Sequence, residues 1–506
     1  MSKIFYLKPG HLSWDECNYL VDNETIQIAL EPSAVADINL SRAVVEKIVA
    51  KKQVVYGINT GLGLLANRII SEEKLHTLQY HALVSHACGI GPALSKRITR
   101  MILLLKINSL SMGYSGVRVE LIERLIFFYN SQLLPIIPEK GSVGASGDLV
   151  PLAHMSLPLI GEGYFNYKND VLTAVDGLNK FGLAPLTLEP KEGLALVNGL
   201  QVSQAIALNA LWQTEVVFHA AILAGSLTTE AMSACLVPFD DRIQQVKGHA
   251  AQIQVATLFR QIFQGSQVNR DQASLNKPVQ NPYSIRCQPQ VMGAILHQIN
   301  WVKETLTVEM NSVSDNPLVF AKDEDIISGG NFHGEMIAMM ADNLALSIAE
   351  IGSLSERRIA LLIDEKFSGL PAFLVKDNGL NSGFMMPQVT AAACASDNKA
   401  LAHPHVVDSI PTSANQEDHV SMATSAALRL SSMIDNTATI VAIELISAAQ
   451  GADFLNVDKL APVTQKLHQL IRSKVKFYDV DRVHAPDIAI IKESVLAGEY
   501  ANIVQH

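Results

Sequence analysis

The chain has 506 residues and a net charge of -10 at neutral pH. Only 17% of the residues are charged, below the roughly 25% typical of soluble chains, which suggests that much of the surface is buried between subunits. The negative charge and the absence of a lysine and arginine cluster argue against a nucleic-acid partner, because phosphate binding relies on clustered cations.

The N-terminal run from Met1 to Gly10 reaches lysine and proline before an apolar segment of signal-peptide length develops. We therefore expect a cytoplasmic protein. The five cysteines are scattered and odd in number, which favours reduced thiols over a disulfide framework. The sequence has no Cys-x-x-Cys pair and no His-Glu-x-x-His motif, and His403-Pro-His405 alone is weak support for zinc. We expect no metal.

Residues 1–193 form a first part of mixed character, in which glycine, proline and asparagine interrupt short apolar runs. This pattern predicts helices with a few short strands. Val54 to Gly63 combines β-branched residues with three glycines, so an extended piece that runs into a flexible loop is predicted there. Its glycine spacing is not G-x-G-x-x-G, and no βαβ pattern surrounds it, which argues against a dinucleotide site.

The run Gly-Ser-Val-Gly-Ala-Ser-Gly-Asp-Leu-Val-Pro at 141–151 allows two interpretations. One is a loop that ends in a helix, with Ser146 or Asp148 as the N-cap and Pro151 in the first turn. In the other, the unshielded Gly147 nitrogen closes a five-membered ring on the Ala145 carbonyl and Ser146 loses water. The product would be a methylidene group conjugated to an imidazolone, a strong electrophile. The two interpretations do not exclude each other.

Residues 194–506 form a second part with long helical patterns and few breaks. Three of them cover Gln201 to Cys235, Glu335 to Phe367 and Ser421 to Gln450. At about 1.5 Å per residue, each helix would be roughly 45–50 Å long. We predict a mainly α fold with a long-helix bundle core and a mixed, loop-rich N-terminal part that carries the 141–151 segment.

A membrane span is the alternative for the stretch from Gly193 to Trp212, which has no formal charge and is long enough to cross a bilayer. The stretch also contains five polar side chains, and burying that many amides and hydroxyls in hydrocarbon would be expensive. They are Asn198, Gln201, Ser203, Gln204 and Asn209. A bundle core buried in an oligomer is the preferred interpretation, with no membrane partner.

The segment from Gly141 to His154 resembles the prosthetic-group segment of the ammonia-lyases and aminomutases that carry 4-methylidene-imidazol-5-one (MIO), and the resemblance continues through most of the chain. It implies that Ala145, Ser146 and Gly147 form this ring autocatalytically and that the ring supplies the electrophile for a substrate amine. It also implies a homotetramer in which each active site combines residues from three chains.

The same resemblance implies roles for further residues. Tyr56, in Tyr-Gly-Ile-Asn-Thr-Gly-Leu-Gly, corresponds to the catalytic base, and Arg286, in Gln-Asn-Pro-Tyr-Ser-Ile-Arg, to the carboxylate clamp, for which a planar guanidinium is suited. Four more residues would line the site: Gln280, Tyr283, Asn198 and Phe332. Of these, Tyr283 would also have a catalytic role. Taken singly, each residue is more simply explained as structural. Leu62 and Leu200 depart from the family pattern.

Two positions bear on the substrate. His86 follows a serine at the side-chain selectivity position, and Glu417 stands where the phenylalanine and tyrosine enzymes usually carry glutamine. A carboxylate can accept a hydrogen bond from an imidazole N–H, whereas a phenyl ring would leave it unpaired. The expected reaction is therefore conversion of L-histidine to trans-urocanate and ammonia.

Three alternatives stay open. The first is an aromatic amino-acid ammonia-lyase or aminomutase acting on tyrosine or phenylalanine with the same prosthetic group. The second is a helical binding scaffold whose loop never forms the ring. The third is an aspartase-like helical enzyme, although the sequence has no counterpart of its Ser-rich Met-Pro-x-Lys loop.

Overall fold

The computed structural model describes residues 3–268, 280–500 and 503. The chain divides into two compact units. Unit 1 comprises residues 1–209, 304–342 and 404–428, and unit 2 comprises residues 210–303, 343–403 and 429–506. Both units are assembled from separate stretches of sequence. The division of the chain at residue 193 into an N-terminal part and a bundle part stays a prediction.

Unit 1 combines short helices with small sheets. Strand β1 (Ile4–Leu7) pairs in parallel with β2 (Gln27–Leu30), and β3 (Ile90–Ala93) pairs antiparallel with β5 (Pro138–Lys140). A three-stranded antiparallel sheet contains β4 (Leu134–Pro135), β6 (Tyr164–Tyr167) and β7 (Asp170–Thr173). Strands β8 (Leu318–Phe320) and β9 (Asp325–Ile327) form an antiparallel hairpin. Its helices are α1 (Trp14–Asp22), α2 (Pro32–Ala50), α3 (Leu75–His86), α4 (Lys96–Leu110), α5 (Val119–Ser131), α6 (Leu149–Ser156), α7 (Ala174–Asn179) and α8 (Glu192–Val197). The prediction of helices with a few short strands is confirmed.

Helix α4 lies in the core of unit 1. The Ser95 side chain caps it by accepting a hydrogen bond from the Ile98 backbone N–H, and every residue from Thr99 to Leu110 is buried. Most of these residues are apolar, but Lys106 is only 1% exposed. A buried lysine costs free energy unless its ammonium is hydrogen-bonded, so its position needs a specific partner.

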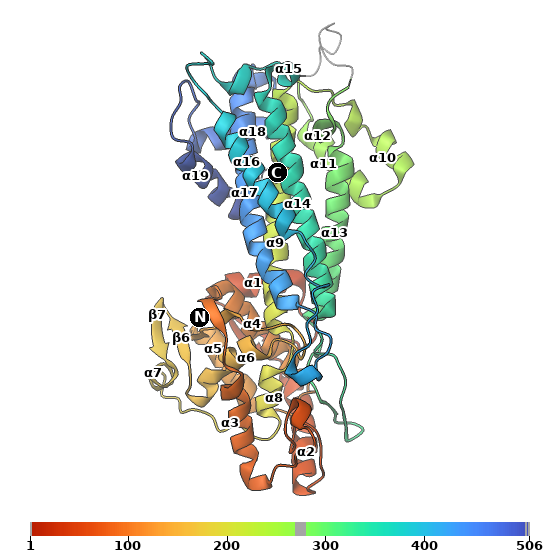
Figure 1. Ribbon diagram of the computed structural model, residues 1–506, viewed down its shortest axis with the longest axis vertical. Coiled ribbons are helices and arrows are strands. Elements are labelled where there is room, and N and C mark those ends of the chain that lie inside the picture. The colour runs from red at the N-terminus through yellow and green to blue at the C-terminus, as the bar shows by residue number, and fades with distance from the viewer. Residues whose placement is uncertain (1–2, 269–279, 501–502, 504–506) are drawn as a thin grey trace. The chain divides into compact units, whose positions relative to one another are not determined.

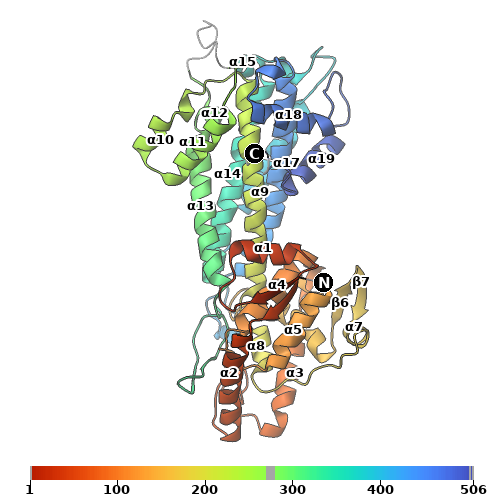
Figure 2. The ribbon, with the colours of Figure 1, turned by 180° about the vertical axis from the view of Figure 1, so that it is seen from behind.

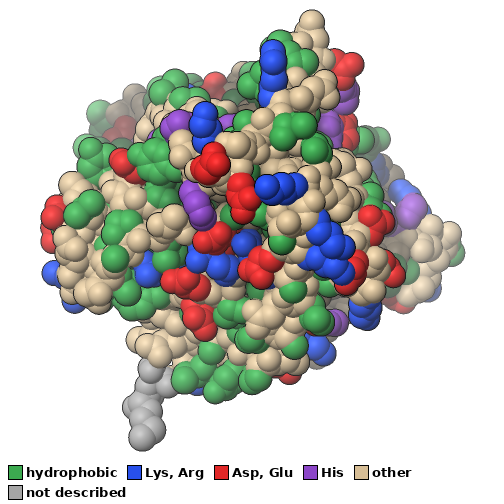
Figure 3. Space-filling view, turned by 90° about the horizontal axis from the view of Figure 1, so that it is seen from below, with side chains coloured by type: hydrophobic (Ala, Val, Ile, Leu, Met, Phe, Trp, Pro, Cys, Tyr) green, Lys and Arg blue, Asp and Glu red, His purple; other side chains and the backbone are tan. Residues whose placement is uncertain are grey.

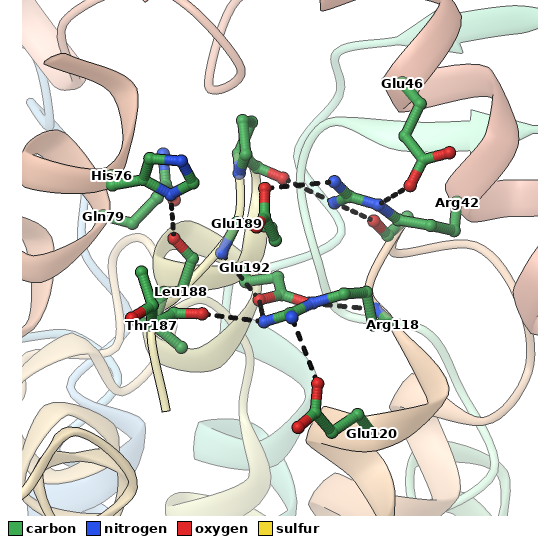
Figure 4. A network of polar contacts seen from close by, with 12 residues as sticks. Arg42, Glu46, His76, Gln79, Arg118, Glu120, Thr187, Leu188, Glu189 and Glu192 are labelled. Carbon is green, nitrogen blue, oxygen red and sulfur yellow. Dashed lines mark hydrogen bonds and ion pairs between the residues drawn. The ribbon is translucent and has the colours of Figure 1, made fainter. Parts of the chain in front are cut away.

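A polar network holds the segment that leads into α8 (Figure 4). The Arg118 guanidinium donates to both carboxylate oxygens of Glu192, at 2.9 and 2.8 Å, and to the Thr187 carbonyl oxygen at 2.8 Å. Arg42 donates to the Pro190 carbonyl oxygen at 3.0 Å. Glu192 is fully buried, so a bidentate partner is what makes its charge tolerable. The network thereby fixes where α8 starts.

Unit 2 is a bundle of long helices. The greater part of α9 (Gln201–Ala231), α13 (Gln288–Glu309), α14 (Glu335–Ile363) and α17 (Ala423–Ala452) lies in this unit, and these helices run side by side in both views (Figures 1 and 2). Inside the bundle, Glu444 of α17 accepts hydrogen bonds from Arg358 of α14 and Thr228 of α9. The remaining helices are α10 (Asp241–Lys247), α11 (Ala250–Ile262), α12 (Tyr283–Arg286), α15 (Glu365–Ser368), α16 (Met385–Leu401), α18 (Pro462–Lys474) and α19 (Ala485–Leu496).

The three predicted long helices are confirmed, with shifted ends. The pattern from Glu335 predicted one helix as far as Phe367, but α14 ends at Ile363. The reason is Asp364, whose side chain accepts a hydrogen bond from the Lys366 backbone N–H at 2.8 Å and starts the short helix α15. A local cap of this kind competes with helix continuation.

By length and composition alone, α9, α14 and α17 could each cross a membrane. In the most apolar window of each helix, 67%, 67% and 78% of the residues are buried inside the protein. Packing within the chain thus accounts for most of their apolar surface. On the face shown in Figure 3, acidic, basic and hydrophobic side chains are interspersed, so this face offers no surface of one charge sign.

Candidate active site

The segment 141–148 forms an irregular loop before α6 and rests on the turn that follows α8. Gly147 has a φ of +73°, and a β-bridge pairs it with Gly199. The Asp148 backbone N–H donates to the Gly199 carbonyl oxygen at 2.7 Å. A positive φ together with this close approach is what glycine permits and other residues resist. The predicted reactive segment is thus held from one side by the Asn198–Gly199 turn.

Asp148 anchors this loop in the core of unit 1. Its carboxylate accepts hydrogen bonds from the Ser203 backbone N–H and hydroxyl at 2.7 and 2.9 Å, from Thr424 at 2.7 Å and from Ser142 at 3.0 Å. Complete burial raises the pKa of Asp148, and these donors oppose that rise. Asp148 does precede α6, as the capping interpretation predicted, but its side chain makes no cap hydrogen bond to the helix.

Asn198 joins the loop to two buried partners. Its side-chain N–H donates to the Asn316 carbonyl oxygen at 3.1 Å, and its backbone carbonyl accepts from the Lys106 ammonium at 2.7 Å. Burial lowers the pKa of Lys106 to about 7. The side-chain oxygen Oδ1 of Asn198 is buried and has no hydrogen-bond partner. A buried acceptor without a donor is costly, which suggests that a ligand with an N–H group supplies one.

Glu417 reaches the centre of the predicted reactive segment. Its Oε1 accepts a hydrogen bond from the Ser146 hydroxyl at 2.8 Å, across 271 positions of sequence, and its Oε2 accepts from Thr412 at 2.9 Å. Thr412 and Glu417 also pair as a β-bridge, which fixes the chain on both sides of the short turn at 413–415. The structure therefore brings together the residue predicted to lose water and the residue predicted to recognise the substrate.

Three other predicted site residues also lie in unit 1. The Tyr56 phenol oxygen accepts a hydrogen bond from the Gly63 backbone N–H at 3.3 Å. His86 is the last residue of α3, with its Nδ1 3.1 Å from the Ser85 hydroxyl. Phe332 is half-buried in the stretch before α14. In this described stretch no strand forms from Val54: residues 53–55 are irregular, turns follow at 56–58, where Gly57 takes a φ of +74°, and Thr60 pairs with Ile69 in an isolated antiparallel bridge.

The predicted carboxylate-binding group lies in unit 2. Arg286 donates a hydrogen bond to the Gln280 side-chain oxygen, and its guanidinium lies 4.6 Å from the centre of the Tyr283 ring. Tyr283 is 70% exposed. Gln280 and Arg286 line a cavity of about 370 Å³. The three residues form one cluster, and their contact with a substrate stays a prediction.

The unit 1 residues fit the ring that the sequence suggests. A Cβ on Gly147 would lie 2.1 Å from the Gly199 carbonyl oxygen, so the backbone packs more closely here than any side chain allows. The unpartnered oxygen of Asn198 and the Glu417 carboxylate are acceptors, which suit the N–H groups of a substrate rather than the ring, because the ring has no donor. The close backbone approach, with no side chain between, suits a group made from the backbone itself.

We expect Gly147→Ala to abolish ring formation and to destabilise unit 1, because the added methyl clashes with Gly199 and forces a positive φ on alanine. The measurement is intact mass, which reports loss of water, together with thermal unfolding. Gly182→Ala is the matched control, since Gly182 also has a positive φ but has nothing within 4 Å of an added Cβ. A Gly147→Ala protein that still lost two waters would contradict this expectation.

The comparisons with known proteins agree with this geometry. The sequence profile of the family described as "Aromatic amino acid lyase" matches residues 12–473. The chain therefore belongs to the aromatic amino acid lyase family, the class of carbon–nitrogen lyases for which MIO is the prosthetic group.

Within that family the chain is 58% identical, over 501 residues and 99% of both chains, to the histidine ammonia-lyase of Legionella pneumophila (strain Paris). Its fold is similar to the crystal structure of histidine ammonia-lyase from Trypanosoma cruzi, with a TM-score of 0.91 and 38% identity, over 99% of this chain and 95% of that one. It is also similar to tyrosine aminomutase from Streptomyces globisporus, with a TM-score of 0.93 and 30% identity over 98% of each chain. The fold is thus shared by proteins named for different amino acids.

The sequence reasoning missed two residues that the structure adds to the site. Lys106 holds the Asn198 carbonyl, and Thr412 holds the Glu417 carboxylate. A signal for Lys106 was present, because a single lysine inside the run Met-Ile-Leu-Leu-Leu-Lys-Ile must be buried with a partner if that run is a core helix. Thr412 carried no signal, since its contact depends on a turn in an irregular stretch.

Proposed function

We propose that this chain eliminates ammonia from L-histidine to give trans-urocanate, the first step of histidine breakdown. The observation that carries this proposal is the Glu417 carboxylate held at Ser146, because a carboxylate there can accept a hydrogen bond from an imidazole N–H. The 58% identity to a histidine ammonia-lyase over nearly the whole chain supports the same substrate. Elimination from tyrosine or phenylalanine, or an aminomutase reaction, is the alternative within the same chemistry.

The prosthetic group in this proposal is MIO, formed autocatalytically from Ala145, Ser146 and Gly147. When present, it supplies an electrophile that turns the substrate amine into a better leaving group. The close glycine pair Gly147 and Gly199 would leave room for it, and the unpartnered Oδ1 of Asn198 would be an acceptor for the substrate amine beside it. The chemistry needs no metal, so a chelator should not abolish turnover.

Side chains would carry out the remaining steps of the proposed reaction, which are proton removal and substrate binding. Tyr56 is the proposed base for the β-proton, with the Gly63 N–H as one donor to its phenol oxygen. Arg286, with Tyr283 and Gln280 beside it, is the proposed clamp for the substrate carboxylate. His86 and Glu417 would orient the imidazole. The remaining contact is Phe332, which would pack against the prosthetic group.

A parallel assay of the conjugated acrylate product from histidine, tyrosine and phenylalanine tests the substrate. Sites that hydrogen-bond a substrate group reject analogues lacking it by large factors, because their own polar groups are left unpaired. The wild type should therefore act on histidine and scarcely on phenylalanine. Faster turnover of tyrosine or phenylalanine would defeat the histidine assignment while leaving the prosthetic group intact.

We also propose a cytoplasmic homotetramer with shared active sites and with neither a membrane nor a nucleic-acid partner. Its support is the low charged fraction and the exposed apolar side chains on the long helices, among them Met336, Met339 and Leu346 of α14. Closed symmetry is the usual way to cover such a face, and D₂ tetramers are common. Ser146 and Glu417 share one unit, whereas Arg286 belongs to the other.

Mixing two inactive variants tests whether sites are shared. If Arg286 serves a site on another chain, tetramers reassembled from Ser146→Ala and Arg286→Ala chains should recover part of the activity, because some sites receive both intact residues. Activity is measured after reversible dissociation, with the composition of each tetramer verified by mass. The matched control mixes Ser146→Ala with Glu417→Ala chains, whose residues lie in one unit and should not complement. Equal results for both mixtures would count against shared sites.

A further inference from the structure

Three side chains that could ligate a metal ion converge at the start of α14 in unit 1. They are His333, Glu335 and His419, and their ligand atoms all lie within 4.8 Å of one another. The Glu335 Oε2 atom is 3.9 Å from Nδ1 of His333 and 3.8 Å from Nε2 of His419. The two imidazole rings are stacked, with centres 5.7 Å apart and planes 2° apart.

The hydrogen bond on the far side of His333 determines which of its nitrogens is free. Nε2 of His333 lies 3.2 Å from the His419 backbone carbonyl oxygen, and a carbonyl can only accept, so Nε2 carries the proton. In the neutral ring, Nδ1 then presents its lone pair toward Glu335. Metal-ligating histidines almost always donate their second N–H to a carbonyl or carboxylate in this way, which fixes both tautomer and ring orientation.

The carboxylate between the rings lacks a donor. Although the Glu335 side chain is partly exposed, its Oε2 atom is buried and has no hydrogen-bond partner. An unpaired buried carboxylate oxygen is costly, and here it faces the lone pair of His333. Two acceptors that face each other, here Glu335 Oε2 and His333 Nδ1, are an arrangement that a cation stabilises.

We propose that His333, Glu335 and His419 bind a divalent transition-metal ion of the zinc class. Two imidazoles and one carboxylate suit zinc, whereas calcium and magnesium prefer all-oxygen ligand sets. Zinc–ligand bonds of roughly 2.0–2.1 Å place tetrahedral ligand atoms about 3.4 Å apart. The two separations from Glu335, 3.8 and 3.9 Å, would contract by a few tenths of an ångström, and the third pair of ligand atoms lies within 4.8 Å.

The ion would join two stretches of chain. His333 and Glu335 belong to the start of α14, and His419 lies two residues after Glu417. A bound ion would restrain the 412–420 segment, and with it the carboxylate that contacts Ser146. This consequence for substrate recognition rests on the proposed function, whereas the binding of the ion does not. The elimination reaction itself does not require the ion.

Calorimetric titration of the metal-stripped full-length protein with Zn²⁺ tests the site. We expect one ion per chain in the wild type. Losing an outer partner of a metal site costs about 10–100-fold in affinity, so His419→Ala, His333→Ala and Glu335→Gln should each weaken binding at least that much. His403→Ala is the matched control, because His403 is an exposed histidine of the neighbouring unit. Zn²⁺ should also raise the Tm of the wild type but not that of His419→Ala.

Two further measurements distinguish failure of the metal-site proposal from failure of the proposed enzyme activity and from misfolding of a variant. Ser146→Ala should bind Zn²⁺ as tightly as the wild type, so that a protein inactive on histidine can still confirm the site. Co²⁺ added to the wild type should give the intense visible absorption of a tetrahedral site, a readout independent of variant folding. Unchanged Zn²⁺ affinity in all three ligand variants, no bound ion in the wild type, or equally tight Mg²⁺ binding would each overturn the assignment.

Discussion

The Ser146→Ala protein is expected to fold and assemble normally, to keep the two water masses that ring formation removes, and to lack activity. Ser146 supplies the hydroxyl whose loss creates the methylidene group, and alanine has nothing to eliminate. Only one hydrogen bond, to Glu417 Oε1, is lost with it, which costs about 1 kcal/mol of stability. Intact mass, product formation from histidine and thermal unfolding are the measurements.

Ser142→Ala is the matched control for this change. Ser142 lies in the same loop and also donates to a carboxylate, that of Asp148, at 3.0 Å. It should therefore lose a similar hydrogen bond but keep both the mass loss and the activity. If Ser146→Ala retained activity, the electrophile would have to come from another part of the chain, and the proposed prosthetic group would be wrong.

Glu417→Gln is expected to lower kcat/KM for histidine by more than tenfold, a change that corresponds to about 1.4 kcal/mol of transition-state stabilisation. The amide keeps the shape and can still accept the hydrogen bond from Thr412, but it removes the charge that favours an imidazole N–H. The gap between histidine and the aromatic substrates should narrow. Parallel kinetics on histidine, tyrosine and phenylalanine measure both effects.

Thr412→Val separates the charge of Glu417 from its placement. Valine removes the 2.9 Å hydrogen bond to Oε2 and leaves the carboxylate in the chain, so the loss on histidine should be smaller than that of Glu417→Gln. A Glu417→Gln protein with unchanged preference for histidine would show that the imidazole is recognised elsewhere, with His86 as the next candidate.

Periodicity was sufficient to predict the long helices. Apolar residues recur at helical spacing along Glu335–Ile363, and that pattern depends only on which face is buried. Gln201–Ala231 is apolar almost all round, and its length without proline was the signal there. The end of α14 was misjudged because a single side chain, Asp364, decided it. Burial patterns carry no information about such local competition.

The contacts within the site could not be predicted from spacing. Ser146 and Glu417 meet across 271 positions, and their contact depends on two irregular loops that no periodic pattern describes. The family resemblance supplied both residues as candidates without their geometry. The cluster at His333 was missed for a related reason: His-x-Glu is a weak motif alone, and its third member is 86 positions away.

The hydrogen bond between Ser146 and Glu417 gives the proposed ring formation a second outcome. Before dehydration, the serine hydroxyl donates to Oε1 of the carboxylate that is proposed to orient the substrate imidazole. The water that leaves carries that hydroxyl away, so the chain acquires its electrophile and releases its specificity group in the same event. A chain that fails to mature would therefore lack the electrophile and would also keep its serine hydroxyl on the carboxylate proposed to recognise the substrate.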